Sequence, residues 1–252
     1  MKFLTELNRR NKLLYWYGAF NFIAVLICIF LIQITSVKVL GINAWIKPMK
    51  FYLSIGIFVW TMAWLMYYLQ MPAKSKFYTW MAIIVFSFES FVISWQAANG
   101  RLSHFNVSTP LYSWLFSFMG IAITVLTIWT SYIGYLFFKK KSFDLPSAYL
   151  WGIRLGIIFF VVFAFEGGIM AALLRHTMGA PDGGIGLPVV NWSREHGDLR
   201  IAHFFGMHAL QLFPLFGFFI AKNKNTVFLF SAVYFSWVTF LLIEALFSHP
   251  LL

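Results

Sequence analysis

Seven long apolar runs recur along this chain, and they restrict the possible folds more than any other feature of the sequence. They lie at about residues 13–35, 48–70, 78–98, 114–138, 149–174, 200–221 and 226–248. A helix of about 20 residues, rising about 1.5 Å per residue, crosses a hydrocarbon core about 30 Å thick. The composition agrees, because 61% of the residues are hydrophobic and 11% are charged. The sequence therefore predicts an all-α fold, a polytopic membrane helical bundle with about seven transmembrane helices.

The connectors between these runs are short, with one exception. We expect residues 1–252 to form a single integral membrane domain, with one long loop at about residues 175–199. The first apolar run follows a basic start but is too long for a secretory signal, so we interpret it as a retained span. Cys28, the one cysteine, lies inside this span, which excludes an intramolecular disulfide.

The basic residues are distributed unevenly between the two sides of the predicted bundle. The N-terminal tail and the connectors at 71–77, 139–144 and 222–225 hold eleven Lys and Arg residues, and the other connectors hold seven. Because cytoplasmic loops are enriched in Lys and Arg, the N-terminus is predicted to be cytoplasmic and the C-terminus outside. We expect the inner (plasma) membrane of a bacterium, and we assign the net charge of +11 to topology and not to nucleic-acid binding.

Ionisable residues inside the spans are the first candidates for chemistry. A charged group at mid-membrane is costly and usually faces a bundle interior or a wet cavity. Counted at about 1.5 Å per residue from the outer helix ends, Glu89 lies about 14 Å deep, and Glu166 and His208 about 12 Å deep. We therefore predict Glu89, Glu166 and His208 as catalytic residues that form one layer.

The segment from Gly184 to Pro214 has the highest density of polar and titratable residues in the chain. Ser193 or Asp198 is expected to cap the helix that begins near residue 200. Arginine forks suit phosphate and carboxylate groups, although they could equally neutralise the acidic residues of the protein itself. The predicted substrate-binding residues are Arg101, His104, Arg194, His196, Asp198, Arg200 and Gln211.

A metal or haem site is a further hypothesis, with His203, His208 and Glu166 as ligands. Mixed histidine and carboxylate ligation suits a first-row transition metal. The two histidines are five residues apart, which turns them by about 140° around a regular helix. The sequence therefore lacks the pair of histidines four residues apart that is typical of zinc enzymes.

These features favour a membrane-embedded enzyme with a Glu/His/Arg pocket that opens on the non-cytoplasmic side. Its expected substrate is lipid-like or anionic, and a transition metal or haem is a possible cofactor. Two alternatives stay open. One is a proton- or ion-coupled transporter that uses Glu89 and Glu166, and the other is a membrane sensor or assembly factor whose outer loops bind a partner.

Overall fold

The computed structural model describes residues 2–184 and 186–251, and its long helices match the predicted spans. Seven are long and apolar enough to cross a membrane: α2 (Lys12–Ile34), α3 (Ile46–Met66) continued by the 3-10 turn η1 (Tyr67–Leu69), α4 (Pro72–Ala98), α5 (Pro110–Lys139), α6 (Ser147–Leu173), α7 (Leu199–Phe219) and α8 (Lys224–Leu246). The predicted all-α membrane fold is thus confirmed. The largest error is at α4, which begins at Pro72 and not near residue 78, since proline is favoured in the first turn of a helix.

The chain divides into two compact units, Met1–Leu126 and Thr127–Leu252, which we describe separately. Unit 1 holds α1 to α4, the first part of α5 and the short strands β1 (Lys38–Val39) and β2 (Ile42–Asn43). Unit 2 holds the rest of α5, helices α6 to α8 and the strands β3 (Thr177–Met178) and β4 (Gly197–Asp198). The proposal of a single integral domain stays a prediction.

Unit 1 begins with a short helix, α1 (Lys2–Arg10), which precedes the first predicted span. Hydrogen bonds from Arg9 and Arg10 lower the pKa of Glu6 to about 2. The guanidinium of Arg10 also lies 3.7 Å from the ring centroid of Trp64 on α3, a cation–π arrangement. The basic residues of the tail therefore fix α1 against α3.

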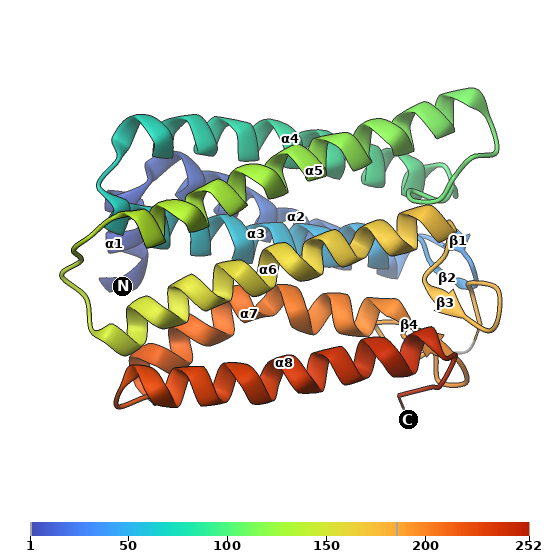
Figure 1. Cartoon of the computed structure of the whole chain (residues 1–252). Helices are drawn as coiled ribbons and strands as arrows, with labels where there is room; N and C mark the ends of the chain where they lie inside the picture. Colours follow the sequence, from blue (N-terminus) through green and yellow to red (C-terminus); the bar gives the residue numbers. More distant parts are fainter. Residues whose placement is uncertain (1, 185, 252) are drawn as a thin grey trace. The chain divides into compact units, whose positions relative to one another are not determined.

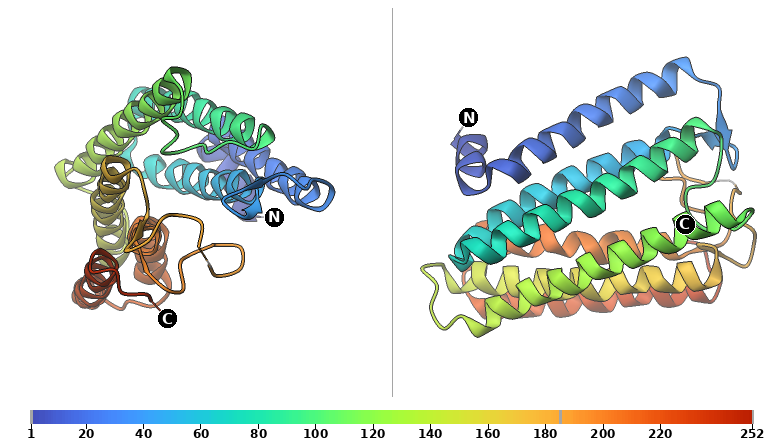
Figure 2. Two further views of the ribbon diagram at one scale, coloured as in Figure 1. Left: turned by 90° about the vertical axis from the view of Figure 1, so that its right-hand side faces the viewer. Right: turned by 90° about the horizontal axis from the view of Figure 1, so that it is seen from above.

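In unit 2, α6, α7 and α8 pack side by side (Figure 1). Phe159 and Phe163 of α6 and Phe213 of α7 form the centre of their shared core. Glycines on α6 allow the close approach to α7, because a methyl group on Gly152 would collide with the carbonyl oxygen of Phe213. The loop between α6 and α7 and the chain after α8 lie at the same end of these three helices (Figure 2).

This close approach leads to a stability prediction. We expect Gly152→Ala to lower the free energy of unfolding by about 1–3 kcal/mol, the usual effect of overpacking. A methyl group on Gly168, in the same helix, would point into open space, with no neighbouring atom of the described residues within 4 Å. Gly168→Ala should therefore be neutral or stabilise by up to about 1 kcal/mol. Thermal unfolding of both variants in one detergent measures the difference, and equal midpoints would contradict the packing argument.

Candidate functional site

The long loop of unit 2 is folded into a hairpin. Strand β3 pairs antiparallel with β4, so that Thr177 lies opposite Asp198. Farther along the loop, Gly186 and Ser193 form an isolated bridge. Asp198 then caps α7 by accepting from the N–H of Arg200 at 3.1 Å, which confirms one of the two predicted capping residues.

The hairpin rests on the end of α8. A methyl group on Gly197 would collide with the carbonyl oxygen of Ala245, so β4 lies directly against the helix backbone. Gly179, which has a φ of +90°, has Ser248 as its close neighbour just after the helix. Only glycine fits these two positions without rearrangement, so the loop and α8 form one packed structure.

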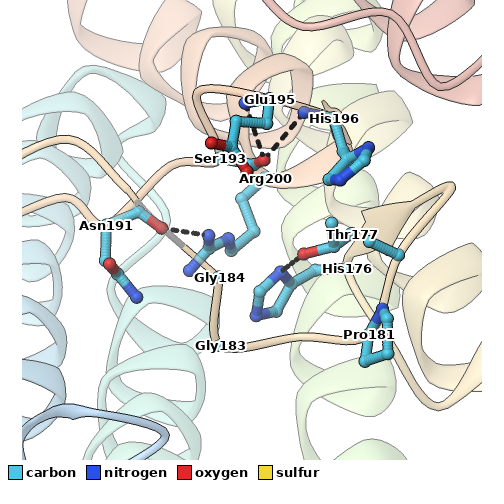
Figure 3. Close-up of a pocket in the computed structure, with 11 residues that line it drawn as sticks. His176, Thr177, Pro181, Gly183, Gly184, Asn191, Ser193, Glu195, His196 and Arg200 are labelled. Atoms are coloured by element: carbon cyan, nitrogen blue, oxygen red, sulfur yellow. Dashed lines mark hydrogen bonds between the residues drawn. The ribbon is translucent and has the colours of Figure 1, made fainter.

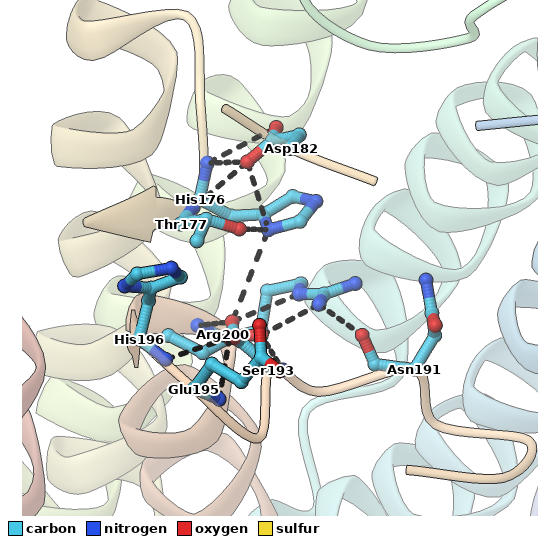
Figure 4. A network of polar contacts seen from close by, with 9 residues as sticks. His176, Thr177, Asp182, Asn191, Ser193, Glu195, His196 and Arg200 are labelled. Carbon is cyan, nitrogen blue, oxygen red and sulfur yellow. Dashed lines mark hydrogen bonds and ion pairs between the residues drawn. The ribbon is translucent and has the colours of Figure 1, made fainter. Parts of the chain in front are cut away.

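Arg200 lies within the network of polar contacts in the loop (Figure 4). It forms an ion pair with Asp198. Arg200 donates from Nε to Oδ1 at 2.9 Å and from Nη2 to Oδ2 at 2.6 Å, the two-pronged geometry of strong Arg–carboxylate pairs. Ser193 adds a backbone N–H to Oδ2 at 2.9 Å, and Arg200 Nη2 also donates to the carbonyl oxygen of Asn191. Asp198 and Arg200, both predicted to bind substrate, thus pair with each other. This is the alternative in which an arginine neutralises an acidic residue of the protein itself.

The electrostatics of Asp198 are set by two opposing effects. Burial raises its pKa, because its side chain has 0% exposure. The hydrogen bonds and charge of Arg200, the N–H of Ser193 and the nearby His176 outweigh burial and hold the pKa below its ordinary value of 3.8. The carboxylate is therefore ionised at neutral pH.

A second carboxylate, Asp182, organises the other side of the hairpin. It accepts hydrogen bonds from the backbone N–H groups of Thr177, at 2.9 Å, and His176, at 3.2 Å. The imidazole Nδ1 of His176 lies 3.3 Å from Asp182 Oδ1 and 3.9 Å from Asp198 Oδ1. His176 is thus held between two carboxylates, a role that the sequence interpretation did not assign to it.

A pocket of about 190 Å³ lies among these loop residues (Figure 3). Its lining is mostly polar or small: His176, Thr177, Ala180, Pro181, Gly183, Gly184, Asn191, Ser193, Glu195, His196 and Arg200. Ser193 Oγ accepts a hydrogen bond from the backbone N–H of His196 at 3.0 Å, which fixes these two lining residues relative to each other. The volume is below the roughly 300–1,000 Å³ of most ligand pockets, so it suits a small polar group. It contains two of the predicted substrate-binding residues, His196 and Arg200.

A histidine one helical turn after Arg200 contacts a buried carboxylate. Glu166 Oε2 on α6 lies 3.0 Å from Nδ1 of His203 on α7, and only 5% of the Glu166 side chain is exposed. Oε1 of Glu166 is buried and has no hydrogen-bond partner among the described residues. Gly167 makes room for the ring, since a methyl group there would lie 2.8 Å from His203 Cε1.

The protonation of the His203 ring follows from its second contact. Nδ1 also lies 2.7 Å from the carbonyl oxygen of Phe163. A carbonyl oxygen only accepts, so Nδ1 must carry the hydrogen that both oxygens share. Nε2 is therefore the nitrogen that gains or loses a proton when His203 changes charge.

His208, the third residue of the predicted metal set, points elsewhere. Its Nδ1 contacts the carbonyl oxygen of Phe204 in its own helix at 2.8 Å, and its ring stacks on the Phe204 ring at 4.1 Å. Within residues 2–184 and 186–251, no three His, Cys, Asp or Glu residues lie together as metal ligands would. Two of the three residues, Glu166 and His203, are brought together, and the metal hypothesis gains no further support.

The remaining predicted site residues lie outside the pocket lining. Arg194 is exposed on the hairpin, and Gln211 is half-buried farther along α7. Glu89, Arg101 and His104 belong to unit 1, so a common layer of Glu89, Glu166 and His208 stays a prediction.

Two signals could have led to the two loop residues whose roles the sequence interpretation missed. His176 follows the end of α6, and Asp182 lies in a turn with two glycines.

Comparison of the chain with protein-family models, curated proteins and solved structures gives no match.

Proposed function

We propose that this protein is a membrane-embedded enzyme that acts on a lipid-like substrate with a small polar head group. The observation that carries the proposal is the contact between the buried Glu166 carboxylate and Nδ1 of His203. A carboxylate that orients a histidine and stabilises its charged form is the arrangement of many general acid–base catalysts. His203 is assigned as the base and Glu166 as the residue that positions it.

The proposed step is a proton transfer at Nε2 of His203. Nε2 takes the proton from a hydroxyl group or water as that oxygen attacks the substrate, and the imidazolium then returns the proton to the leaving group. Glu166 stabilises the imidazolium between the two transfers. If Glu166 only held α6 against α7, one hydrogen-bonded carboxylate oxygen would be enough. Its other oxygen, Oε1, is buried without a hydrogen-bond partner among the described residues. Such unsatisfied buried groups are commonly found in active sites.

The loop pocket is the proposed binding site for the head group. Arg200 lines the pocket and precedes His203 by three residues, a spacing that places Cβ atoms about 5–6 Å apart on a helix surface. Because Asp198 already neutralises Arg200, the pocket favours hydroxyl-rich or singly charged groups over strongly anionic ones. A volume of about 190 Å³ holds such a group while the lipid tail stays in the bilayer.

We further propose that this pocket lies on the non-cytoplasmic side of a bacterial inner membrane, as the distribution of Lys and Arg suggests. Single cysteines in a Cys28→Ser background test this orientation. Glu195→Cys should react with a membrane-impermeant maleimide in intact cells, whereas Lys141→Cys should react only after permeabilisation; both native residues are exposed. The opposite labelling pattern would reverse the proposed orientation.

The enzyme proposal is tested with lipids because the substrate is not identified. Cells with and without the protein are extracted, and their lipids are compared by mass spectrometry. At least one lipid should be depleted and a related product enriched, and the conversion should depend on His203. Identical lipid profiles in the two cell types would count against the proposal.

A further inference from the structure

Unit 1 contains a group of buried polar side chains that the proposed enzyme does not use. Glu89 and Gln96 on α4 are 5% and 0% exposed. They are seven residues apart, which places them on the same face of the helix. Glu89 lies nine residues before the end of α4 at Ala98, about 14 Å along the helix axis.

The orientation of the Gln96 amide is fixed by its neighbours. Asn106 Nδ2 donates to the carbonyl oxygen of Leu102 at 3.0 Å, so this atom must be the amide nitrogen. The same nitrogen lies 3.1 Å from Gln96, whose facing atom must therefore be the acceptor Oε1. Consequently Gln96 Nε2 is a buried donor, and it has no hydrogen-bond partner among the described residues.

Two further polar atoms of α4 are also buried without a hydrogen-bond partner among the described residues. They are Oε1 of Glu89 and Oγ of Ser90. An unsatisfied polar group in a membrane interior is strongly unfavourable, so partners are expected. Water is the smallest molecule that both accepts from Gln96 and donates to Glu89.

We propose that unit 1 contains a hydrated proton-binding site, in which water links Gln96 to Glu89 and Glu89 takes up a proton from the side of the 99–109 loop. Asn106 connects this loop to Gln96, and Gln96 leads on to Glu89. The separation along α4 requires more than one water molecule. The bound species is a proton, carried along hydrogen-bonded water.

The charges around the site favour a proton over a metal cation. The positive charge of Lys47 on α3 acts on Glu89, and Gln96 presents its NH₂ group, so a metal cation would be repelled. Other titratable groups lie on the elements packed against α4: Lys50 and Tyr52 on α3, Tyr17 on α2, Arg101 and His104 in the loop, and Tyr112 on α5. Tyr52 and Tyr17 hydrogen-bond to Ser94 and Ser87, on the side of α4 away from Glu89.

Thiol accessibility tests the hydration. Ser90→Cys and Gln96→Cys are made singly in a Cys28→Ser background, with Phe91→Cys as control because Phe91 is 66% exposed on the outer surface of α4. The thiolate, which forms in water and not in lipid, attacks the sulfur of a charged thiosulfonate reagent and displaces a sulfinate, so both site cysteines should react about tenfold or more faster than the control. Reaction no faster than Phe91→Cys would show a dry site and overturn the proposal.

Infrared spectroscopy of the purified full chain tests the proton itself. A carboxylic-acid C=O band should titrate with pH, shift rapidly in D₂O and disappear in Glu89→Gln, while Glu89→Asp should keep a shifted band. Gln96→Leu should slow the D₂O shift. A titrating band that survives in a folded Glu89→Gln protein would overturn the proposal. His203→Gln should leave both readouts unchanged, so this proposal and the enzyme proposal fail independently.

Discussion

Replacing His203 by glutamine should reduce the proposed lipid conversion by about 10²- to 10⁴-fold, the usual contribution of a general acid–base residue. Glutamine keeps a polar side chain but has no group that exchanges a proton near neutral pH. Glu166→Gln should have a smaller but still large effect, because an amide does not stabilise the imidazolium of His203. Conversion is measured as the product-to-substrate lipid ratio in extracts of cells that contain equal amounts of each variant.

The chain provides a matched control for this experiment. Glu244 and His249 form the same contact, Oε2 to Nδ1 at 3.0 Å, but their side chains are 35% and 62% exposed. Glu244→Gln should therefore retain conversion within about twofold, since an exposed pair contributes little. If His203→Gln and the wild type convert lipid equally, His203 is not the base. If Glu244→Gln loses conversion to the same extent, the effect is not specific to the buried pair.

The second large effect is expected at Asp198. Asp198→Asn leaves Arg200 without its counter-charge, and breaking a buried ion pair in this way destabilises by about 3–5 kcal/mol. The hairpin and the start of α7 should open, because Asp198 holds both of them. Hydrogen–deuterium exchange of residues 186–200 should rise strongly in this variant. Glu195→Gln, which changes an exposed residue of the same loop, should exchange like the wild type.

Asp198 also sets an acid limit for the loop. Its pKa is held below the ordinary value of 3.8, so its contribution to stability is complete above that value and is lost as the pH falls through the lower folded-state pKa. Protection of the wild-type hairpin should therefore persist through mildly acidic pH and decline below about 4. Asp198→Asn should show no such step. A wild-type loop that opens well above about pH 4 would contradict the assignment to Asp198.

The spans were predictable because a membrane helix needs a long apolar run, and each of the seven carries one. Glu166 stands out in the sequence, since a carboxylate inside such a run is costly and is expected to have a partner or a function. The metal hypothesis grouped Glu166 with His203 and His208, but the direct contact of Glu166 with His203 alone could not be predicted, because the rotation of α7 against α6 is set by close contacts such as Gly152 on Phe213. His208 is turned by about 140° from His203 around the same helix, and it contacts Phe204 of that helix instead.

The loop was harder to predict than the helices. Its strands are two residues long, too short to show an alternating pattern. The pairing of His176 with Asp182 depends on the turn between them, and that of Asp198 with Arg200 competes with binding an external anion. The sequence therefore located the polar segment correctly but left open whether its charges face each other or a ligand.

The contact of Gly197 and Gly179 with the end of α8 has a consequence for biogenesis. The ribosome makes the hairpin residues before α8, so the newly made loop lacks the surface on which it packs. The pocket can take its final form only after the seventh span has been inserted and has come to lie beside α6 and α7. A chain interrupted before α8 would still be anchored by six spans, yet we expect it to lack a formed pocket.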